Sequence, residues 1–426
     1  MPETLLPFVE RRARRRVDEL FTEEPVLVLS GPRTVGKSQL LKGLGRDHGV
    51  EVYDLDDSTI RLAVSADPSL YVAGPSPVCV DEWQFVETIV ESVKAELNKD
   101  LRPGRFVLTG STRSDARPIL ARALAGRYHE FTILPFSQGE LDGVEERFLD
   151  LLLEEGGEAL LTTEPSRETR AGYVRRIVAG GLPLAVARAT GSRGRWFDGY
   201  IRDVMERDVK ALRRIHQSDA LPKLLSRLAA RSAQILDVRN AIEGLGLVEE
   251  TGAAYVNLLV AVHLVRLLPA WGTTLASGVA RKPKVHLVDS GVASRMLRVS
   301  KDRLARGDPS AQSEFGHLLE SFVVGELLKQ TSWRDGIATS GHWSRRSRAE
   351  VDFILEVDDG DVFAFEIKAG TTLERADFAG LELLRDLLGP RFRAGIVLNL
   401  GTRSFSHGDR IFVLPVDALW RSYPHA

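Results

Sequence analysis

The chain has 426 residues, of which 43% are hydrophobic and 27% charged, and its formal net charge is -2. This length predicts about two or three domains, and the near-neutral charge excludes a general attraction to nucleic acid, so any such contact would come from local patches. The single cysteine, Cys79, excludes internal disulfides, favours a reducing cytoplasmic location and, because it lies in an apolar run, predicts a buried core thiol rather than a nucleophile.

The N-terminal part of the sequence is basic. Residues 5–21 predict an amphipathic helix with an apolar stripe and arginines around the rest of its surface. One interpretation is a basic arm that contacts nucleic acid. We favour the other, a solvated face on which Glu10, Asp18 and Glu19 offset part of the positive charge. No apolar run follows the arginines and polar residues interrupt the longest apolar stretch, 255–271, so we expect neither a targeting segment nor a membrane span.

A phosphate-binding pattern follows. The sequence GPRTVGKS fits G-x-x-x-x-G-K-[ST], after an apolar run typical of a buried parallel strand and before residues that can open a helix. Its glycines let the backbone fold around a phosphate, so that main-chain N–H groups and the helix N-terminus face the anion. Lys37 would reach the β- and γ-phosphates and Ser38 would hold Mg2+. The residues predicted to bind the nucleotide are Gly31, Pro32, Arg33, Thr34, Val35, Gly36, Lys37 and Ser38.

Two later strands end in polar residues that suit phosphate chemistry. An apolar strand ends in Asp81, predicted to bind the nucleotide through Mg2+, and Glu82, predicted to accept a proton from the attacking water. The next buried strand ends in hydroxyl residues. A polar side chain there can orient the lytic water, with Ser111 as the first catalytic candidate and Thr109 as the second; a plain turn with hydroxyl caps is an equal alternative.

Strands predicted at 50–55 and 130–136 complete an alternation of strands and helices. This alternation predicts an α/β fold, with a parallel sheet covered by helices on both faces and the nucleotide at the carboxyl ends of the strands. The chain is similar to one branch of bacterial and archaeal AAA+ ATPases in its phosphate loop and in Val80-Asp81-Glu82, Leu108-Thr109-Gly110-Ser111, Leu124-Ala125-Gly126-Arg127 and Leu134-Pro135-Phe136-Ser137.

That branch carries, after its ATPase domain, a C-terminal domain of unknown function that resembles PD-(D/E)XK nucleases, and the similarity covers nearly the whole chain. The resemblance implies ATP as the nucleotide and an arginine finger that acts between the subunits of a homo-oligomer. Arg127 is the leading candidate for this catalytic arginine and Arg207 is the second. For each of them a surface ion pair is the alternative.

The middle of the chain lacks strand alternation. Residues 137–215 are predicted to be helical and to form a lid over the nucleotide. Helical stretches at 221–230, 238–245 and 253–264 then resemble a winged-helix unit. Because the last of these offers no arginine or lysine for a DNA groove, we expect it, with His263, to pack in the core.

The C-terminal part changes to a mixed pattern of helices and strands. Residues 315–330 predict a helix that carries Glu320, and two strands at 351–356 and 362–368 are joined by a bulged hairpin loop. The loop sets a register that pairs Asp352 with Glu366 on one face, opposite a face of phenylalanine and leucine. Facing carboxylates repel unless a cation lies between them, which indicates Mg2+.

The sequence Glu366-Ile367-Lys368 resembles the Glu-x-Lys strand motif of PD-(D/E)XK nucleases. The resemblance implies that Asp352, Glu366 and Glu320 bind a metal ion and that Lys368 is catalytic, positioning water or steadying developing charge. The arginines that precede the first strand, Arg345, Arg346 and Arg348, would hold a phosphate backbone. The alternative is a solvated strand face with an ordinary ion pair.

We therefore predict an AAA+ ATPase core at 1–140, a helical lid at 141–217, a winged-helix-like unit and linker at 218–310, and a restriction-endonuclease-like domain at 311–426. The favoured function is an ATP-binding and ATP-hydrolysing protein whose nuclease-like domain acts on or binds DNA or RNA. The alternative is a nucleotide-dependent switch or scaffold whose C-terminal domain is a non-cutting module for protein interaction.

Overall fold

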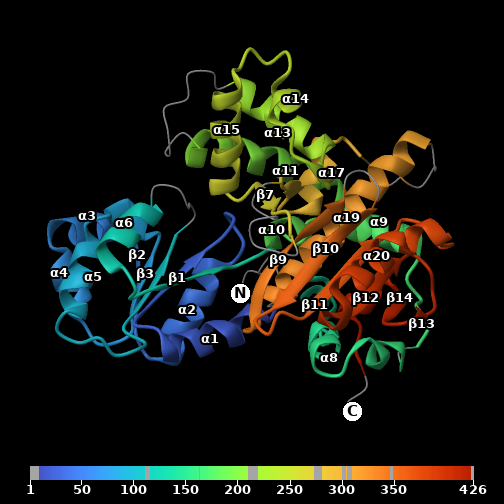
Figure 1. The fold of residues 1–426 in the computed structure, drawn as a ribbon. Helices are drawn as coiled ribbons and strands as arrows, with labels where there is room; N and C mark the ends of the chain where they lie inside the picture. Colours follow the sequence, from blue (N-terminus) through green and yellow to red (C-terminus); the bar gives the residue numbers. More distant parts are fainter. Residues whose placement is uncertain are drawn as a thin grey trace.

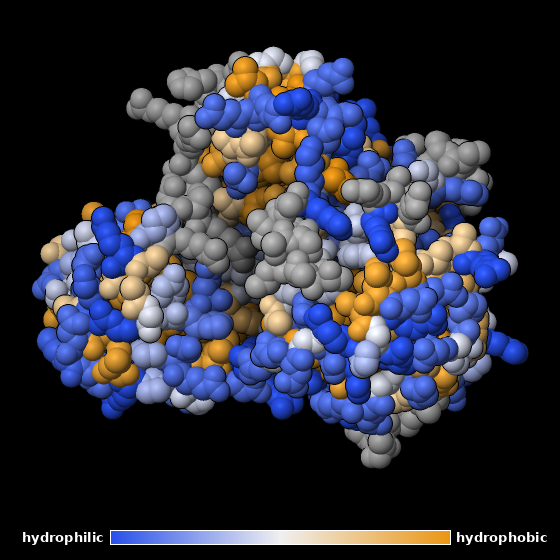
Figure 2. Space-filling model, in the orientation of Figure 1, coloured by the Kyte–Doolittle hydropathy of each residue, from blue (hydrophilic) through white to orange (hydrophobic). Residues whose placement is uncertain are grey.

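The computed structural model describes residues 9–110, 116–162, 164–209, 219–272, 281–299, 304, 309–345 and 349–423. Figure 1 shows an N-terminal α/β unit, a C-terminal α/β unit beside it, and a largely helical unit against both. On the face drawn in Figure 2, hydrophilic residues cover much of the surface, and hydrophobic residues gather most over the largely helical unit.

The N-terminal unit confirms the predicted parallel sheet. Its strand order is β2-β3-β4-β1-β5, and every pair in it runs parallel. The strands are β1 (Val26–Ser30), β2 (Val52–Asp54), β3 (Val78–Asp81), β4 (Phe106–Thr109) and β5 (His129–Thr132). The helices are α1 (Ala13–Glu23), α2 (Lys37–Asp47), α3 (Ser58–Ala66), α4 (Pro68–Val72), η1 (Trp83–Val86), α5 (Ile89–Leu97) and α6 (Ala116–Leu124).

Alternate residues of β1 explain why helices cover both faces of this sheet. Val26 and Val28 pack in a cluster with residues of α5 and α6, while Leu27 and Leu29 pack with residues of α1 and α2. Cys79 lies in the second cluster, fully buried, and burial raises the pKa of its thiol to about 12. The predicted core thiol is confirmed.

The region expected to be one helical lid divides between two surroundings. Its helices are α7 (Gln138–Asp142), α8 (Phe148–Glu154), η2 (Gly157–Thr162), α9 (Arg170–Ala179), α10 (Pro183–Val186), α11 (Thr190–Asp203) and the π-helix η3 (Val204–Val209). Both α8 and η2 pack on the C-terminal unit, where the rings of Phe148 and Phe365 lie 6.3 Å apart. Apolar burial thus places residues 148–162 against the C-terminal sheet. A helical lid spanning 141–217 stays a prediction.

The segment predicted to resemble a winged-helix unit contains the predicted helices and a small antiparallel sheet. Its elements are α13 (Ala220–Ala230), β6 (Gln234–Ile235), α14 (Val238–Ile242), α15 (Glu249–Ala261), β7 (Val265–Leu268) and β8 (Lys284–Leu287), followed by α17 (Ser290–Met296). The sheet order is β6-β8-β7. Tyr255, Val256 and Leu259 of α15 are buried, and so is His263 just after it, as expected for core packing.

The C-terminal unit is a mixed sheet with the strand order β13-β14-β12-β11-β10-β9. Its main helix, α19, packs against β10 and β11, and α20 covers the other face (Figure 1). The elements are α19 (Pro309–Ser332), β9 (Ile337–Arg345), β10 (Ala349–Val357), β11 (Val362–Ile367), η4 (Arg375–Phe378), α20 (Ala379–Leu388), η5 (Gly389–Arg391), β12 (Phe392–Asn399), β13 (Phe405–Gly408), β14 (Ile411–Pro415) and η6 (Val416–Trp420).

The predicted hairpin register is confirmed, but a bulge changes the expected faces. Phe353 pairs with Phe365, and Gly360 of the loop has the left-handed φ of 82°. Against β9, however, the register shifts between Val351 and Ile354, so both of these residues pack on the α20 face. Strict alternation along the strand predicts Asp352 on the same face as Ile354. Because of the bulge, Asp352 points away from that face.

Candidate nucleotide site and C-terminal carboxylate cluster

The phosphate loop joins β1 to α2 in a conformation that requires glycine. Gly31 has a φ of 143°, and a Cβ atom there would lie 2.3 Å from the carbonyl oxygen of Ile133. Gly36 has a φ of 102° and caps α2, which begins at Lys37. The N-terminus of α2 therefore lies in the loop, where its free main-chain N–H groups can bind an anion.

Lys37 lies inside the loop. Its side chain is buried, and Nζ donates to the carbonyl oxygens of Gly31 at 3.0 Å and Pro32 at 2.9 Å. Burial lowers the pKa of the Lys37 ammonium, although the carboxylates of Glu82 and Asp81 oppose this effect. The residues of the loop therefore fit a triphosphate, because they combine N–H donors with a buried cation.

Asp81, Glu82 and Thr109 meet at the carboxyl ends of β3 and β4. The Thr109 hydroxyl donates to Asp81 Oδ1, and the main-chain N–H of Glu82 lies 3.3 Å from Thr109 Oγ1, which accepts it. Asp81 and Thr109 are buried. Since β4 lies between β1 and β3, these side chains stand next to the phosphate loop, where Asp81 and Ser38 would hold Mg2+.

Glu82 has an unusual backbone. Its φ is 53°, in the left-handed region that residues other than glycine seldom occupy, and its Oε2 accepts a hydrogen bond from Gln84 Nε2. Sequence reasoning missed Gln84, which follows on η1. Ser111, the first candidate for orienting water, lies outside the described residues, so its role stays a prediction. Thr109 contacts the carboxylate of Asp81 and the backbone N–H of Glu82.

Sequence reasoning also missed a carboxylate from the middle of the chain. Asp208 of the π-helix η3 is buried, and its Oδ2 lies 3.4 Å from Nε of Arg33 in the phosphate loop. Burial raises the pKa of Asp208, an effect that Arg33 opposes and Glu82 increases. The neighbouring Arg207, the second candidate finger, is exposed. A short π-helical segment had no sequence signal, although such segments occur often at functional sites.

Arg127 lies at the other end of the sheet. It follows α6, close to the start of β5, and its Nη1 donates to Asn98 Oδ1 at 2.8 Å. The phosphate loop follows the carboxyl end of β1, which runs parallel to β5, so Arg127 does not join the site of its own chain. Its role between subunits stays a prediction.

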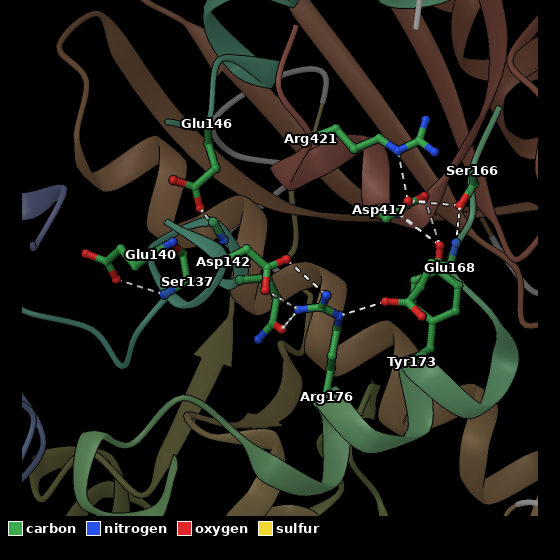
Figure 3. A network of polar contacts seen from close by, with 12 residues as sticks. Ser137, Glu140, Asp142, Glu146, Ser166, Glu168, Tyr173, Arg176, Asp417 and Arg421 are labelled. Carbon is green, nitrogen blue, oxygen red and sulfur yellow. Dashed lines mark hydrogen bonds and ion pairs between the residues drawn. The ribbon is translucent and has the colours of Figure 1, made fainter. Parts of the chain in front are cut away.

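Arg11 connects the phosphate loop to the segment that follows β5. Its guanidinium donates to the carbonyl oxygens of Val35 at 2.7 Å and Leu134 at 2.6 Å, and to Glu140 Oε1 at 3.0 Å. Glu140 also accepts from the N–H of Ser137, closing a capping box on α7 (Figure 3). Arg11 of the basic N-terminal segment thus has a structural role that the charge of the segment alone did not reveal.

A polar network continues from α7 to the C-terminal unit (Figure 3). Arg176 of α9 binds Asp142 with two hydrogen bonds, at 3.0 and 2.9 Å, and binds Glu168 at 2.9 Å. Nearby, Asp417 of η6 accepts from the hydroxyls of Ser166 at 2.9 Å and Tyr173 at 3.1 Å. These contacts connect α9 to α7 and to η6 of the C-terminal unit.

The C-terminal carboxylates surround a lysine that sequence reasoning did not consider. Nζ of Lys284, the first residue of β8, lies 2.7 Å from Glu320, 2.6 Å from Glu350 and 3.0 Å from Asp352. Burial lowers the pKa of Lys284, but the three carboxylates outweigh the effect of burial, so the pKa of Lys284 is raised. Burial also raises the pKa of Glu320, to which Asp352 adds repulsion.

Glu366 has a separate lysine partner. Its Oε1 lies 2.8 Å from Nζ of Lys368, whose ammonium is also 3.4 Å from Asp377. Burial and the repulsion of Asp352 raise the pKa of Glu366 to about 8, although Lys368 opposes this. The other oxygen of Glu366, Oε2, is buried without a hydrogen-bond partner among the described residues.

The predicted Mg2+ centre at Glu320, Asp352 and Glu366 does not fit this arrangement. An ammonium already lies among the carboxylates of the first two, and a second ammonium binds Glu366. Within the part of the chain that the structure describes, no group of three or more His, Cys, Asp or Glu side chains is arranged to hold a metal ion. The sequence pattern did not reveal this lysine, because Lys284 comes from a distant strand. Metal binding by the three carboxylates and the catalytic role of Lys368 stay predictions.

Comparisons with known proteins agree with the N-terminal site. Residues 23–142 match the family model described as "AAA domain", which supports a P-loop ATPase of the AAA type. Residues 170–303 match "Domain of unknown function (DUF8612)" and residues 315–419 match "Domain of unknown function (DUF4143)". The nuclease-like character of the C-terminal part is not among these matches.

Two curated relatives match along nearly the whole of this chain. The chain is 26% identical over 419 residues to the uncharacterized proteins Mb2031c of Mycobacterium bovis and Rv2008c of Mycobacterium tuberculosis, covering 96% of this chain and 85% of each relative. Among solved structures, the Walker-type ATPase PABY2304 of Pyrococcus abyssi is 15% identical, with a TM-score of 0.38, over 68% of this chain and 96% of that one.

Among the helices of the described residues, none combines the length and the apolar composition needed to cross a membrane.

Proposed function

We propose that this protein binds ATP with Mg2+ in the loop between β1 and α2 and hydrolyses it. The observation that carries the proposal is the contact of Thr109 with Asp81 and Glu82 beside a loop that buries Lys37. Mg2+, when bound, supplies positive charge that stabilises the transferred phosphoryl group, and Ser38 and Asp81 would hold it.

The chain's own residues supply the remaining steps. Lys37 exchanges the carbonyl oxygens of Gly31 and Pro32 for phosphate oxygens, because a phosphate offers its ammonium a full negative charge. Glu82 accepts a proton from the attacking water, and Gln84 holds its carboxylate in place. Thr109 orients Asp81 through a buried hydroxyl.

Replacing Glu82 by glutamine tests this assignment. Glu82→Gln keeps the shape of the side chain but cannot accept the proton, so turnover should fall by about 10²-fold or more. ATP affinity, measured by calorimetry, should change little. The matched control is Glu91→Gln, at an exposed position of α5. Unchanged turnover in Glu82→Gln would show that another group is the base, and an absence of ATP binding by the unaltered protein would remove the proposal.

Two proposals concern the C-terminal part. Binding of DNA or RNA is supported by the exposed Arg345 at the end of β9; Arg346 and Arg348 lie outside the described residues. A nucleotide-dependent switch with a non-cutting interaction module is supported by Lys284 among the carboxylates and by the buried face of α15. Because the cluster lacks the arrangement that metal-assisted cleavage needs, we favour the second.

Titration with labelled DNA and RNA at low salt separates these proposals. Phosphate contacts weaken steeply as salt rises, so binding that is lost at higher salt would support the nucleic-acid proposal. The switch proposal expects no such binding. It also expects limited proteolysis of the C-terminal part to differ between the protein with ATP and the protein without it.

A homo-oligomer with Arg127 acting across subunits is a further proposal from the same AAA-type likeness. In Arg127→Ala, turnover per subunit should fall while ATP affinity persists, because the guanidinium would act only at a neighbour's site. Mixing Arg127→Ala with Glu82→Gln should then restore part of the turnover. Unchanged turnover in Arg127→Ala would contradict the catalytic role, and the hydrogen bond to Asn98 would then be the role of this arginine.

A further inference from the structure

Lys284 joins two structural units at one point. It is the first residue of β8 in the largely helical unit, and its partners belong to α19 and β10 of the C-terminal unit. Lys284 is 36 residues from Glu320 and 68 residues from Asp352 along the chain. The contact is therefore an interface between units and not a local ion pair on one element.

Main-chain contacts fix the place of this lysine. The N–H of Trp271, after β7, donates to the carbonyl oxygen of His342 on β9 at 2.7 Å, and the N–H of His342 donates to Pro269 at 2.9 Å. Lys284 itself pairs with Leu268 across the sheet of β7 and β8. Since β9 pairs with β10, the backbone holds Lys284 beside the strand that carries Asp352.

Charge and burial make the lysine and the carboxylates depend on each other. Lys284 is 2% exposed, and a buried ammonium is very costly unless anions surround it. Asp352 and Glu320 are also largely buried, so without a cation their charges would repel. The buried Oε2 of Glu366, without a hydrogen-bond partner among the described residues, adds a further acceptor to the same cluster.

We propose that the ammonium of Lys284 takes the place of a metal ion in this carboxylate cluster, and that removing it converts the cluster into a site for a divalent cation. The acidic oxygens that divalent cations prefer are present, but a fixed positive charge from a neighbouring unit occupies their centre. The proposal is independent of ATP hydrolysis, because no residue of the phosphate loop takes part.

Replacing Lys284 by methionine tests the proposal, with Mn2+ as the probe. Lys284→Met keeps a long side chain without charge, and electron paramagnetic resonance measures free Mn2+ in nucleotide-free protein. We expect Lys284→Met to bind Mn2+ at least about tenfold more tightly than the unaltered protein, because a repelling charge has left. Adding Asp352→Asn to Lys284→Met should abolish the gain, and this comparison cancels any Mn2+ held at the phosphate loop.

Two further variants keep the test decisive. Lys368→Met removes the lysine that binds Glu366 and should gain much less Mn2+ affinity than Lys284→Met, since Lys368 lies outside the centre. If circular dichroism shows that Lys284→Met does not fold, the single variant Asp352→Asn, which keeps Lys284, replaces it in the test. The Mn2+ titration of Asp352→Asn should equal that of the unaltered protein. Loss of a Mn2+ site in that variant, or no gain in folded Lys284→Met, would overturn the proposal.

Discussion

Arg33 of the phosphate loop and Asp208 of the π-helix η3 form an ion pair, with Nε of the arginine 3.4 Å from Oδ2 of the aspartate. Because Arg33 belongs to the phosphate loop, this contact lies next to the residues predicted to bind the phosphates of a nucleotide. Asp208 also interacts electrostatically with Lys37 and Glu82. A carboxylate from the middle of the chain therefore opposes the cations that the loop presents to an anion.

Removing that carboxylate should strengthen nucleotide binding. In Asp208→Asn the repulsion of a triphosphate is lost and Arg33 becomes available to it, so the Kd for ATP should fall by about threefold to tenfold. Fluorescence titration with a labelled ATP analogue measures this. The matched control is Asp203→Asn, an exposed residue on α11, which should change nothing. Weaker binding in a folded Asp208→Asn protein would instead mean that Asp208 holds Arg33 in its binding position.

The Thr109 hydroxyl should matter for turnover more than for affinity. Thr109→Val keeps the volume of the side chain but removes the donor to Asp81, and losing such a supporting hydrogen bond typically costs about 10- to 100-fold in activity. Thr109→Ser, which keeps the hydroxyl, should recover most of the loss. Steady-state phosphate release gives kcat and KM for both variants; equal activity in Thr109→Val would show that this contact is only structural.

Gly31 should tolerate no side chain. In Gly31→Ala the Cβ atom would collide with the carbonyl oxygen of Ile133, and the φ of 143° is unfavourable for alanine, so unfolding free energy should fall by about 1–3 kcal/mol or more. Chemical denaturation measures the change, and ATP binding should be lost with it. Gly199→Ala in helix α11, where a Cβ atom meets nothing within 4 Å, should be neutral or stabilising. A fully stable Gly31→Ala would mean that the loop rearranges easily.

Glu146 should make stability depend on pH. Burial, with added repulsion from Glu326 and Glu140, raises its pKa from 4.5 to about 7. Between these values the folded state binds more protons than the unfolded state, so the contribution of Glu146 to stability falls as the pH rises through this window. The difference in unfolding free energy between the unaltered protein and Glu146→Gln should therefore fall by up to about 3 kcal/mol between about pH 5 and about pH 8.

Denaturant titrations across this pH range test the prediction. Glutamine at position 146 still accepts from the N–H of Gly139, which Glu146 binds at 3.0 Å, so the comparison isolates the charge. The neighbouring Glu145 is the control, because Arg12 lowers its pKa and Glu145→Gln should show a small dependence of the opposite sign. A flat difference for Glu146→Gln would show that Glu146 is already ionised throughout this range.

Short-range features of this protein were predictable from the sequence. The phosphate loop, the order of strands and helices in the N-terminal unit, and the pairing of Phe353 with Phe365 depend on residues close together in the chain. Local glycines and alternating apolar residues fix such features through backbone geometry and burial. The acids at the end of β3 and the hydroxyl residue at the end of β4 were found in the same way.

Contacts between distant segments were decided only by the tertiary structure. Asp208 reaches Arg33, Arg11 reaches Glu140, and Lys284 reaches Asp352 over separations that no local pattern encodes. The bulge beside Val351 also depends on pairing with β9, and it turned Asp352 away from its expected face. A carboxylate in a sequence does not reveal which cation will neutralise it, because that cation comes from whichever element packs against it, and here it is an ammonium in place of the expected metal.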